Sequence, residues 1–290
     1  MLSVMFKRQR TGSVVCASCG SLVGVNDEQC YTCGRRNPGL WGFGPVLRTL
    51  GNDFGFIPVV VYGCSALYAL ALLLTLKDGG QILGGGLMSM LAPGRLASLS
   101  LGMSGEVPVY RYGMWWTILS AGWLHGSALH ILFNMMWVRQ LGPAIADIYG
   151  GARLVIIYTI ASACGFLLSS TAGHVMPALP LIAGAPFTLG ASAAIFGLLG
   201  ALVDDGRRGG SSIIRSQATG YAISMFVFGL IFPGIDNYAH AGGFAGGYLA
   251  SMWLDPLKPE RGNHLVVALA CLVATVASIV ASYLFVALHS

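Results

Sequence analysis

Residues 57–76 read IPVVVYGCSALYALALLLTL, a run of twenty residues without a charged side chain. At about 1.5 Å per residue, a helix of this length spans roughly 30 Å, the thickness of the hydrocarbon core of a bilayer. The whole chain of 290 residues is similarly apolar, with 55% hydrophobic and only 9% charged residues. Soluble domains carry about 25% charged residues. The composition therefore excludes an ordinary soluble enzyme and a disordered chain.

Six further apolar stretches follow along the chain, and none of them contains Lys, Arg, Asp or Glu. They comprise residues 114–138, 154–172, 188–203, 217–232, 237–254 and 264–288. The middle three, from 188 to 254, are short or rich in glycine, so we expect buried helices that the others shield from lipid. The sequence thus predicts an all-α membrane protein, with a polytopic domain of about seven transmembrane helices over residues 51–290.

The positively charged residues divide unevenly between the two sides of these stretches. Thirteen of the sixteen Lys and Arg residues lie in the N-terminal segment or in loops on its side, and only Lys77, Arg95 and Arg111 lie on the other. Because Lys and Arg concentrate in cytoplasmic loops, we expect a cytoplasmic N-terminus and an external C-terminus. The first fifty residues lack the apolar core of a signal peptide, which favours a multi-pass protein of a bacterial inner membrane.

The predicted partners follow from the same features. The net charge of +5 is too small to indicate nucleic acid, so we expect the lipid bilayer and other membrane proteins instead. Residues 77–113 form a loop that is too long for a simple connection. Its many Gly and Leu residues predict that this loop lies in the membrane interface.

Four cysteines form two Cys-x-x-Cys pairs within residues 1–50, at Cys16, Cys19, Cys30 and Cys33, and a glycine follows each pair. Two such turns place four thiolates around one tetrahedral ion, which predicts a zinc-ribbon-like module with structural zinc. An iron centre and an unmetallated redox pair are the alternatives. A Cys₄ site has no open coordination position, so we expect this module to bind a cytoplasmic partner rather than to catalyse a reaction.

Polar residues recur at similar depth in three of the predicted helices. His130 and Asn134 share one helix face, while Ser192 and His240 lie near the start of two other helices. A serine hydroxyl becomes a nucleophile when an imidazole removes its proton, and the resulting oxyanion needs hydrogen-bond donors. Small residues at every fourth position, such as Ala239, Gly243 and Gly247, would let the helices approach closely enough for this chemistry.

Each of these residues also has an ordinary structural explanation. A serine in an apolar helix commonly bonds the carbonyl four residues earlier, and a membrane histidine commonly packs or bonds a neighbouring helix. Asp236 could orient His240 in a catalytic triad, but we expect it to cap the helix that follows. A metal site built from His125, His130 and His240 is a further alternative.

Together these motifs resemble the rhomboid family of intramembrane serine proteases. The motifs are His125-x₄-His130-x₃-Asn134, Gly190-x-Ser192 and Ala239-His240-x-Gly242-Gly243. The resemblance implies a bundle of six core helices plus one C-terminal helix, with the 77–113 loop packed beside the core. It also implies a Ser–His dyad without an acid or a cofactor, in which Ser192 is the nucleophile and His240 the base. His130 and Asn134 would then donate to the oxyanion, with His125 in support at the rim.

Three positions depart from that family's pattern. Thr117 follows Trp116 where the family often has Arg, Ala193 follows the serine where many members have Gly, and Phe196 replaces a common Tyr. The anchoring of the 77–113 loop and the width of the oxyanion pocket could therefore differ. The expected activity is cleavage of transmembrane proteins. A catalytically inactive rhomboid-like binder of client helices is the second hypothesis. A small transporter is the third, although no inverted repeat is evident.

Overall fold

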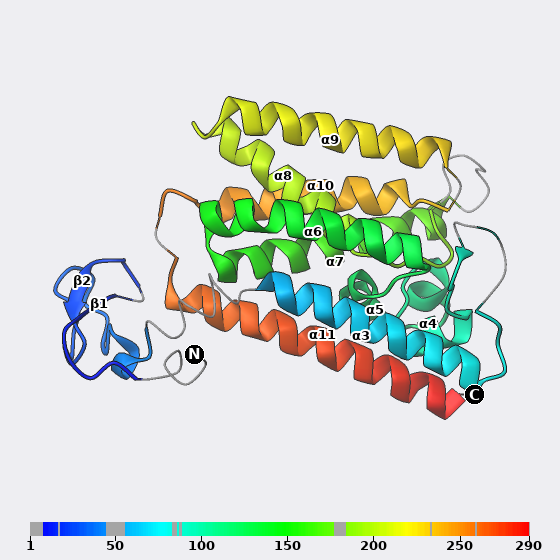
Figure 1. The fold of residues 1–290 in the computed structure, drawn as a ribbon, viewed down its shortest axis with the longest axis horizontal. Helices are drawn as coiled ribbons and strands as arrows, with labels where there is room; N and C mark the ends of the chain where they lie inside the picture. Colours follow the sequence, from blue (N-terminus) through cyan, green and yellow to red (C-terminus); the bar gives the residue numbers. More distant parts are fainter. Residues whose placement is uncertain are drawn as a thin grey trace.

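The computed structural model describes residues 8–16, 18–44, 56–82, 86, 89–176, 184–232, 234–258 and 260–289. In these ranges a bundle of seven long helices follows a small two-stranded module (Figure 1). The helices are α3 Phe56–Lys77, α6 Ala128–Tyr149, α7 Gly151–Val175, α8 Ser192–Arg207, α9 Ser212–Ile231, α10 Asn237–Trp253 and α11 Gly262–His289. The prediction of an all-α membrane bundle with a small N-terminal cysteine module is confirmed.

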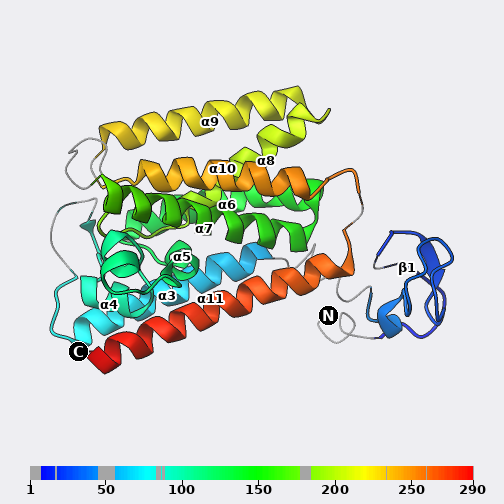
Figure 2. The ribbon, with the colours of Figure 1, turned by 180° about the vertical axis from the view of Figure 1, so that it is seen from behind.

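The N-terminal module is built around one short hairpin. Strands β1 (Ser13–Val15) and β2 (Leu22–Gly24) pair antiparallel, with Val14 opposite Val23. Figures 1 and 2 agree that the module lies beyond the end of the bundle where α11 begins. The domain boundary predicted at residue 50 stays a prediction, because residues 45–55 lie outside the described part of the chain, as do Lys7 and Arg48 of the charge count.

The second helix begins later than the apolar stretch 114–138 predicts. Helix α6 starts at Ala128, because the side chain of Ser127 accepts a hydrogen bond from the backbone N–H of His130 and caps the helix. It continues to Tyr149 and therefore includes Arg139, one of the thirteen basic residues that the charge count assigned to the N-terminal segment and the loops on its side. Residues 117–123 form two short helical turns instead, α5 (Thr117–Ser120) and η4 (Ala121–Trp123).

The long loop also folds into short helices, α4 (Arg95–Ser100) and the turn η3 (Val107–Arg111). In Figure 1, α4 and α5 lie at the end of the bundle opposite the cysteine module. Residues 83–85, 87 and 88, which belong to the stretch predicted to lie in the membrane interface, fall outside the described residues.

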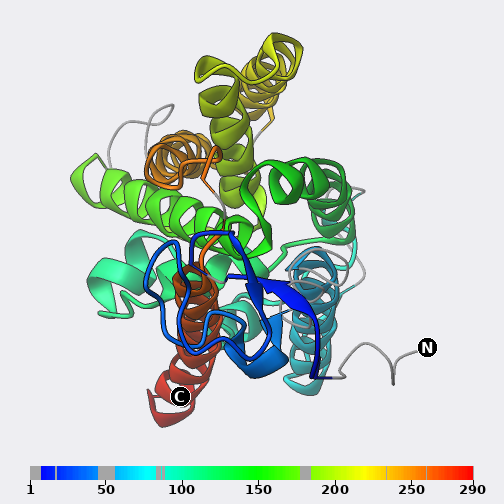
Figure 3. The same cartoon turned by 90° about the vertical axis from the view of Figure 1, so that its left-hand side faces the viewer.

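Shielding from lipid differs among the three middle helices. The three middle helices are α8, α9 and α10, and of these α8 and α10 have only 16 and 17 residues. Helices α3, α7 and α11 are, by contrast, individually long and apolar enough to cross a membrane. Helix α8 is buried over residues 193–202, as predicted. The prediction is wrong for α9, which buries only Ala218, Ala222 and Gly229 and lies at the edge of the bundle, olive at the top of Figure 3.

Glycine allows α8 and α10 to touch through their backbones. A Cβ atom added to Gly243 would lie 2.0 Å from the carbonyl oxygen of Ala193, and one added to Gly247 would lie 2.2 Å from that of Gly197. Any side chain at these positions would force the two helices apart. The predicted role of the small residues in close packing is therefore confirmed, and this contact lies beside Ser192 and His240.

Candidate functional site

The polar residues singled out in the sequence lie at the starts of three helices. His130 is the third residue of α6, Ser192 the first of α8 and His240 the fourth of α10. The backbone N–H of Ala128, at the start of α6, donates to the Met90 carbonyl. The residues just before α8 are bonded to the segment before α6, since the Gly190 N–H donates to the Ala121 carbonyl. In Figure 1, α6, α8 and α10 all begin at the end of the bundle away from the cysteine module.

The His240 imidazole stacks on Phe196, with ring centroids 4.2 Å apart and an angle of 14° between the planes. Phe196 lies one turn after Ser192 on the same face of α8. Because Gly243 of α10 also touches Ala193, the imidazole packs against the face of α8 that carries the serine. The stacking expected from the spacing of Ser192 and Phe196 is thus present.

Asp236 caps α10 and does not orient the imidazole. Its Oδ1 accepts the backbone N–H of Ala239 at 3.0 Å, and its Oδ2 accepts the hydroxyl of Ser169 at 2.5 Å. His240 itself is only 5% exposed, and within the described residues its Nδ1 has no hydrogen-bond partner. The cap that we expected is confirmed, and the triad with Asp236 has no geometric support.

The His130 ring lies against Gly190, two residues before Ser192. A Cβ atom added to Gly190 would lie 2.7 Å from His130 Nε2 and 3.8 Å from the Ser192 hydroxyl oxygen. His130 Nδ1 accepts the backbone N–H of Gly126 at 3.3 Å, so a neutral ring carries its hydrogen on Nε2. The ring nitrogen that lies against Gly190, two residues before Ser192, is therefore a hydrogen-bond donor.

Asn134 is 5% exposed and lies one turn after His130 on α6. Its Nδ2 donates one hydrogen to the His130 carbonyl at 2.8 Å. An amide nitrogen carries two hydrogens, so the second stays available to another acceptor. The side chain is thus fixed to its own helix and retains a donor.

His125 is buried rather than at the rim of the site. It is 2% exposed, lies before α6 begins, and packs edge-on to His130 with ring centroids 5.2 Å apart. Neither ring nitrogen has a partner among the described residues. These residues also contain no metal-binding cluster of histidines, so nothing supports the alternative of a metal held by His125, His130 and His240.

The segment before Ser192 is held by a backbone pairing that the sequence alone does not predict. Ser104 and Thr188 exchange two backbone hydrogen bonds, of 3.0 and 2.8 Å, and the Gly190 N–H donates to the Ala121 carbonyl at 2.9 Å. Gly190 has a φ of 131°, which strongly favours glycine. In the sequence, only the glycine of the Gly190-x-Ser192 motif indicates a turn here. The backbone groups that bond Thr188 and Gly190 lie about 70 to 85 residues earlier in the chain.

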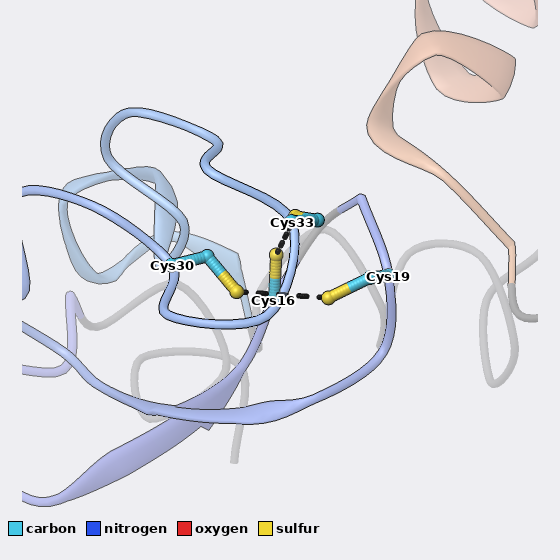
Figure 4. Close-up of side chains that lie close together, drawn as sticks. All are labelled: Cys16, Cys19, Cys30 and Cys33. Atoms are coloured by element: carbon cyan, nitrogen blue, oxygen red, sulfur yellow. Dashed lines mark hydrogen bonds between the residues drawn. The ribbon is translucent and has the colours of Figure 1, made fainter.

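The four cysteines converge in the N-terminal module, as the spacing predicts (Figure 4). All four sulfur atoms lie within 4.8 Å of one another. The Cys16 and Cys33 sulfurs are 3.8 Å apart, and the Cys19 and Cys30 sulfurs are 3.6 Å apart. A tetrahedral zinc ion with Zn–S bonds of about 2.3 Å places its sulfurs about 3.8 Å apart, so the cluster fits zinc.

The backbone around the cysteines suits thiolate ligands. Gly20 and Gly34 adopt positive φ angles, and their N–H groups donate to the carbonyls of Cys16 and Cys30 in the turn of each pair. The Ser18 N–H points at the Cys16 sulfur at 3.4 Å. A hydrogen bond to Ser21 lowers the pKa of Cys19 to about 6, whereas burial raises that of Cys16 to about 11. The spacing of the four sulfur atoms, rather than these pKa shifts, is what allows the cluster to hold a metal ion.

Comparison with known proteins points in the same direction as the geometry. Residues 112–256 match the rhomboid domain family. The chain is 30% identical to RHOMBOID-like protein 4 of Arabidopsis thaliana over 177 residues, covering 60% of this chain and 42% of that protein. It is 31% identical to Rhomboid protease GluP of Bacillus subtilis (strain 168) over 182 residues, covering 61% of this chain and 33% of that protein. The chain thus spans less than half the length of these curated relatives.

Proposed function

Because the chain belongs to the rhomboid family, we propose that it is an intramembrane serine endopeptidase that cleaves transmembrane segments of other membrane proteins. The observation that carries the proposal is the stacking of His240 on Phe196, one helical turn from Ser192. This contact supports a Ser192–His240 dyad in which the imidazole acts without an acidic partner. The protease name of one bacterial relative supports the same activity at the level of the family.

In the proposed mechanism, the Ser192 oxygen attacks the substrate carbonyl carbon while His240 takes the hydroxyl proton. His240 then gives this proton to the leaving amine, and water hydrolyses the acyl-enzyme by the reverse sequence. His130 Nε2–H, the Asn134 amide and the backbone N–H of Ser192 would donate to the oxyanion. The last of these is unpaired within the helix, because the first amides of any α-helix lack intrahelical partners.

The location of the reaction is part of the proposal. The charge distribution supports a cytoplasmic N-terminus, which would place Ser192 near the external leaflet and the cysteine module in the cytoplasm of a bacterium. Water would reach the serine from outside, between α6, α8 and α10. Substrate helices must unwind to expose a peptide bond, so helices weakened by glycine should be preferred. The cysteine module would bind structural zinc and a cytoplasmic partner.

The proposal is tested by cleavage of a reporter transmembrane substrate in proteoliposomes. We expect Ser192→Ala and His240→Ala each to reduce kcat by about 10³-fold or more, because neither residue can act without the other. Ser65→Ala is a matched control, since that hydroxyl bonds only the Val61 carbonyl of its own helix. Cleavage at the wild-type rate by both site variants would remove the proposed mechanism.

An inactive, client-binding protein is the second candidate function. The observation that favours it is that the Ser192 hydroxyl and the His240 ring make no hydrogen bond to each other in the described structure. Catalytic hydrogen bonds often shorten only when substrate binds, so this geometry does not by itself exclude activity. A fluorophosphonate that labels the wild type but not Ser192→Ala would establish the protease. Client binding without labelling would establish the binder.

A further inference from the structure

Helix α11 carries a buried row of hydroxyl groups on an otherwise apolar surface. Thr275, Ser278 and Ser282 are all less than 5% exposed, and their spacing places them on one helix face. The Thr275 hydroxyl bonds the Cys271 carbonyl of its own helix. The Ser282 hydroxyl also donates to a carbonyl of α11, that of Ser278, at 2.9 Å. Both serines in addition contact another part of the chain, so the row is more than a set of intrahelical bonds.

Both serines bind the segment that contains α5. The Ser278 hydroxyl donates to the Trp116 carbonyl at 2.7 Å and lies 2.9 Å from the Ser120 hydroxyl. The Trp116 indole N–H donates to the Ser282 hydroxyl at 3.0 Å. Polar bonds between helices matter in a membrane, because lipid offers no alternative partner for these groups.

The segment held by α11 in turn holds the residues before the candidate nucleophile. The Ser120 hydroxyl donates to the Gly102 carbonyl at 2.9 Å, which ties α5 to the residues just before Ser104. Ser104 pairs with Thr188, and the carbonyl of Ala121 accepts the Gly190 N–H. Two successive layers of hydrogen bonds therefore connect α11 to the turn that ends at residue 192.

We propose that Ser278 and Ser282 are positioning residues, which fix the turn of residues 188–190 through the segment of residues 102–121. The inference rests on the proposed protease function and extends it to the C-terminal helix. Gly190 packs directly against the His130 ring, so a displaced turn would move both the nucleophile and an oxyanion donor. A displacement of about 1 Å at a reacting group can reduce a rate by about 100-fold.

The test compares Ser278→Ala/Ser282→Ala with wild type in the full chain, reconstituted in proteoliposomes and treated with a fluorophosphonate. We expect kinact to fall by about tenfold or more while KI changes by less than about twofold, since the probe pocket is intact. Thr275→Val is the matched control, because it removes a buried hydroxyl from the same row that bonds only its own helix. An unchanged kinact in the double variant, or an equal loss in the control, overturns the inference.

Hydrogen exchange provides a readout that does not depend on activity. The amides of Thr188 and Gly190 are bonded to the 102–121 segment, so we expect faster exchange in residues 184–191 of the double variant but not of Thr275→Val. Wild-type exchange in the double variant overturns the inference. Failure of wild type to react with the probe would instead reject the proposed function. If the double variant does not fold, Ser278→Ala and Ser282→Ala are measured singly with the same expectations.

Discussion

Phe196 contacts the candidate base directly, because its phenyl ring is stacked on the His240 imidazole. Aromatic pairs contribute about 0.5–1.5 kcal/mol beyond burial, which corresponds to roughly a two- to tenfold change in rate if the stack holds the ring in its reactive position. We therefore expect Phe196→Ala to lower kcat by up to about tenfold. Phe196→Tyr, which keeps the stack, should cleave the reporter within about twofold of wild type. Equal rates for Phe196→Ala and wild type would show that the stack has no catalytic role.

Gly190 allows a second test at the scale of single residues. An alanine at this position would be strained by the φ of 131° and would place its Cβ 2.7 Å from His130 Nε2. We expect Gly190→Ala to slow fluorophosphonate labelling by about 100-fold, because the turn and the donor must both move. Gly220→Ala in α9 is the control, since nothing lies within 4 Å of a Cβ added there. Labelling of Gly190→Ala at the rate of this control would contradict the close packing of His130 against Gly190.

Local sequence was enough to predict some of these residue-level features but not others. Asp236 precedes a helix and Phe196 lies four residues after Ser192, so the cap and the stacking face follow from nearby residues alone. The burial of His125 depends on how the chain folds before α6. The apolar residues around His125 do not determine whether its ring points into the protein or toward the rim of the site.

At the scale of elements, hydrophobic runs predict which residues enter the membrane better than where each helix begins. The run at 114–138 is continuous in composition, yet it is divided at Ser127, where a side-chain cap starts α6. Likewise, the run at 217–232 resembles its neighbours, but α9 stays at the edge because few of its residues meet another helix. Pairing of residues 104 and 188 is a long-range contact, and hydrophobic periodicity carries no information about such contacts.

The cysteine module is the element whose stability we expect to depend on a metal. Among its described residues, the core contains only Val14, Val23 and Val25 besides the cysteines, which is too little apolar area to fold alone. We expect one zinc ion per chain by elemental analysis, and loss of the module's native fold after chelation or in Cys30→Ser. Reporter cleavage should change by less than about twofold, because the module lies at the opposite end of the bundle from the start of α8.

Other outcomes of this metal analysis would identify the alternatives. Iron in place of zinc, with the absorption of a thiolate-bound iron centre, would contradict structural zinc. A metal-free module that keeps its fold would favour the redox pair. Cys64→Ala is a suitable control, because this buried cysteine lies in α3 and takes no part in the cluster. It should leave the zinc content unchanged.

At the scale of the whole molecule, two independent observations concern how the protein is oriented. Thirteen of the sixteen basic residues lie on the predicted cytoplasmic side. Separately, an odd number of long helices in the described ranges places the cysteine module and the end of α11 at opposite ends of the bundle (Figures 1 and 2). The charge distribution indicates which side of the membrane is cytoplasmic. The fold indicates only that the cysteine module and the end of α11 lie on opposite sides. Together they support the proposed orientation, in which the starts of α6, α8 and α10 face the outside.

This orientation can be measured with alkaline phosphatase, which needs disulfides and is therefore active only outside a reducing cytoplasm. We expect a fusion after residue 289 to be active and a fusion after residue 209, in the connection between α8 and α9, to be inactive, in a bacterial host. The same two sites fused to a cytoplasmic fluorescent reporter should give the opposite pattern, which controls for expression. Activity after residue 209 together with inactivity after residue 289 would invert the molecule. The serine would then face the cytoplasm, and the cysteine module would lie outside, where its thiols would be prone to form disulfides rather than to hold zinc.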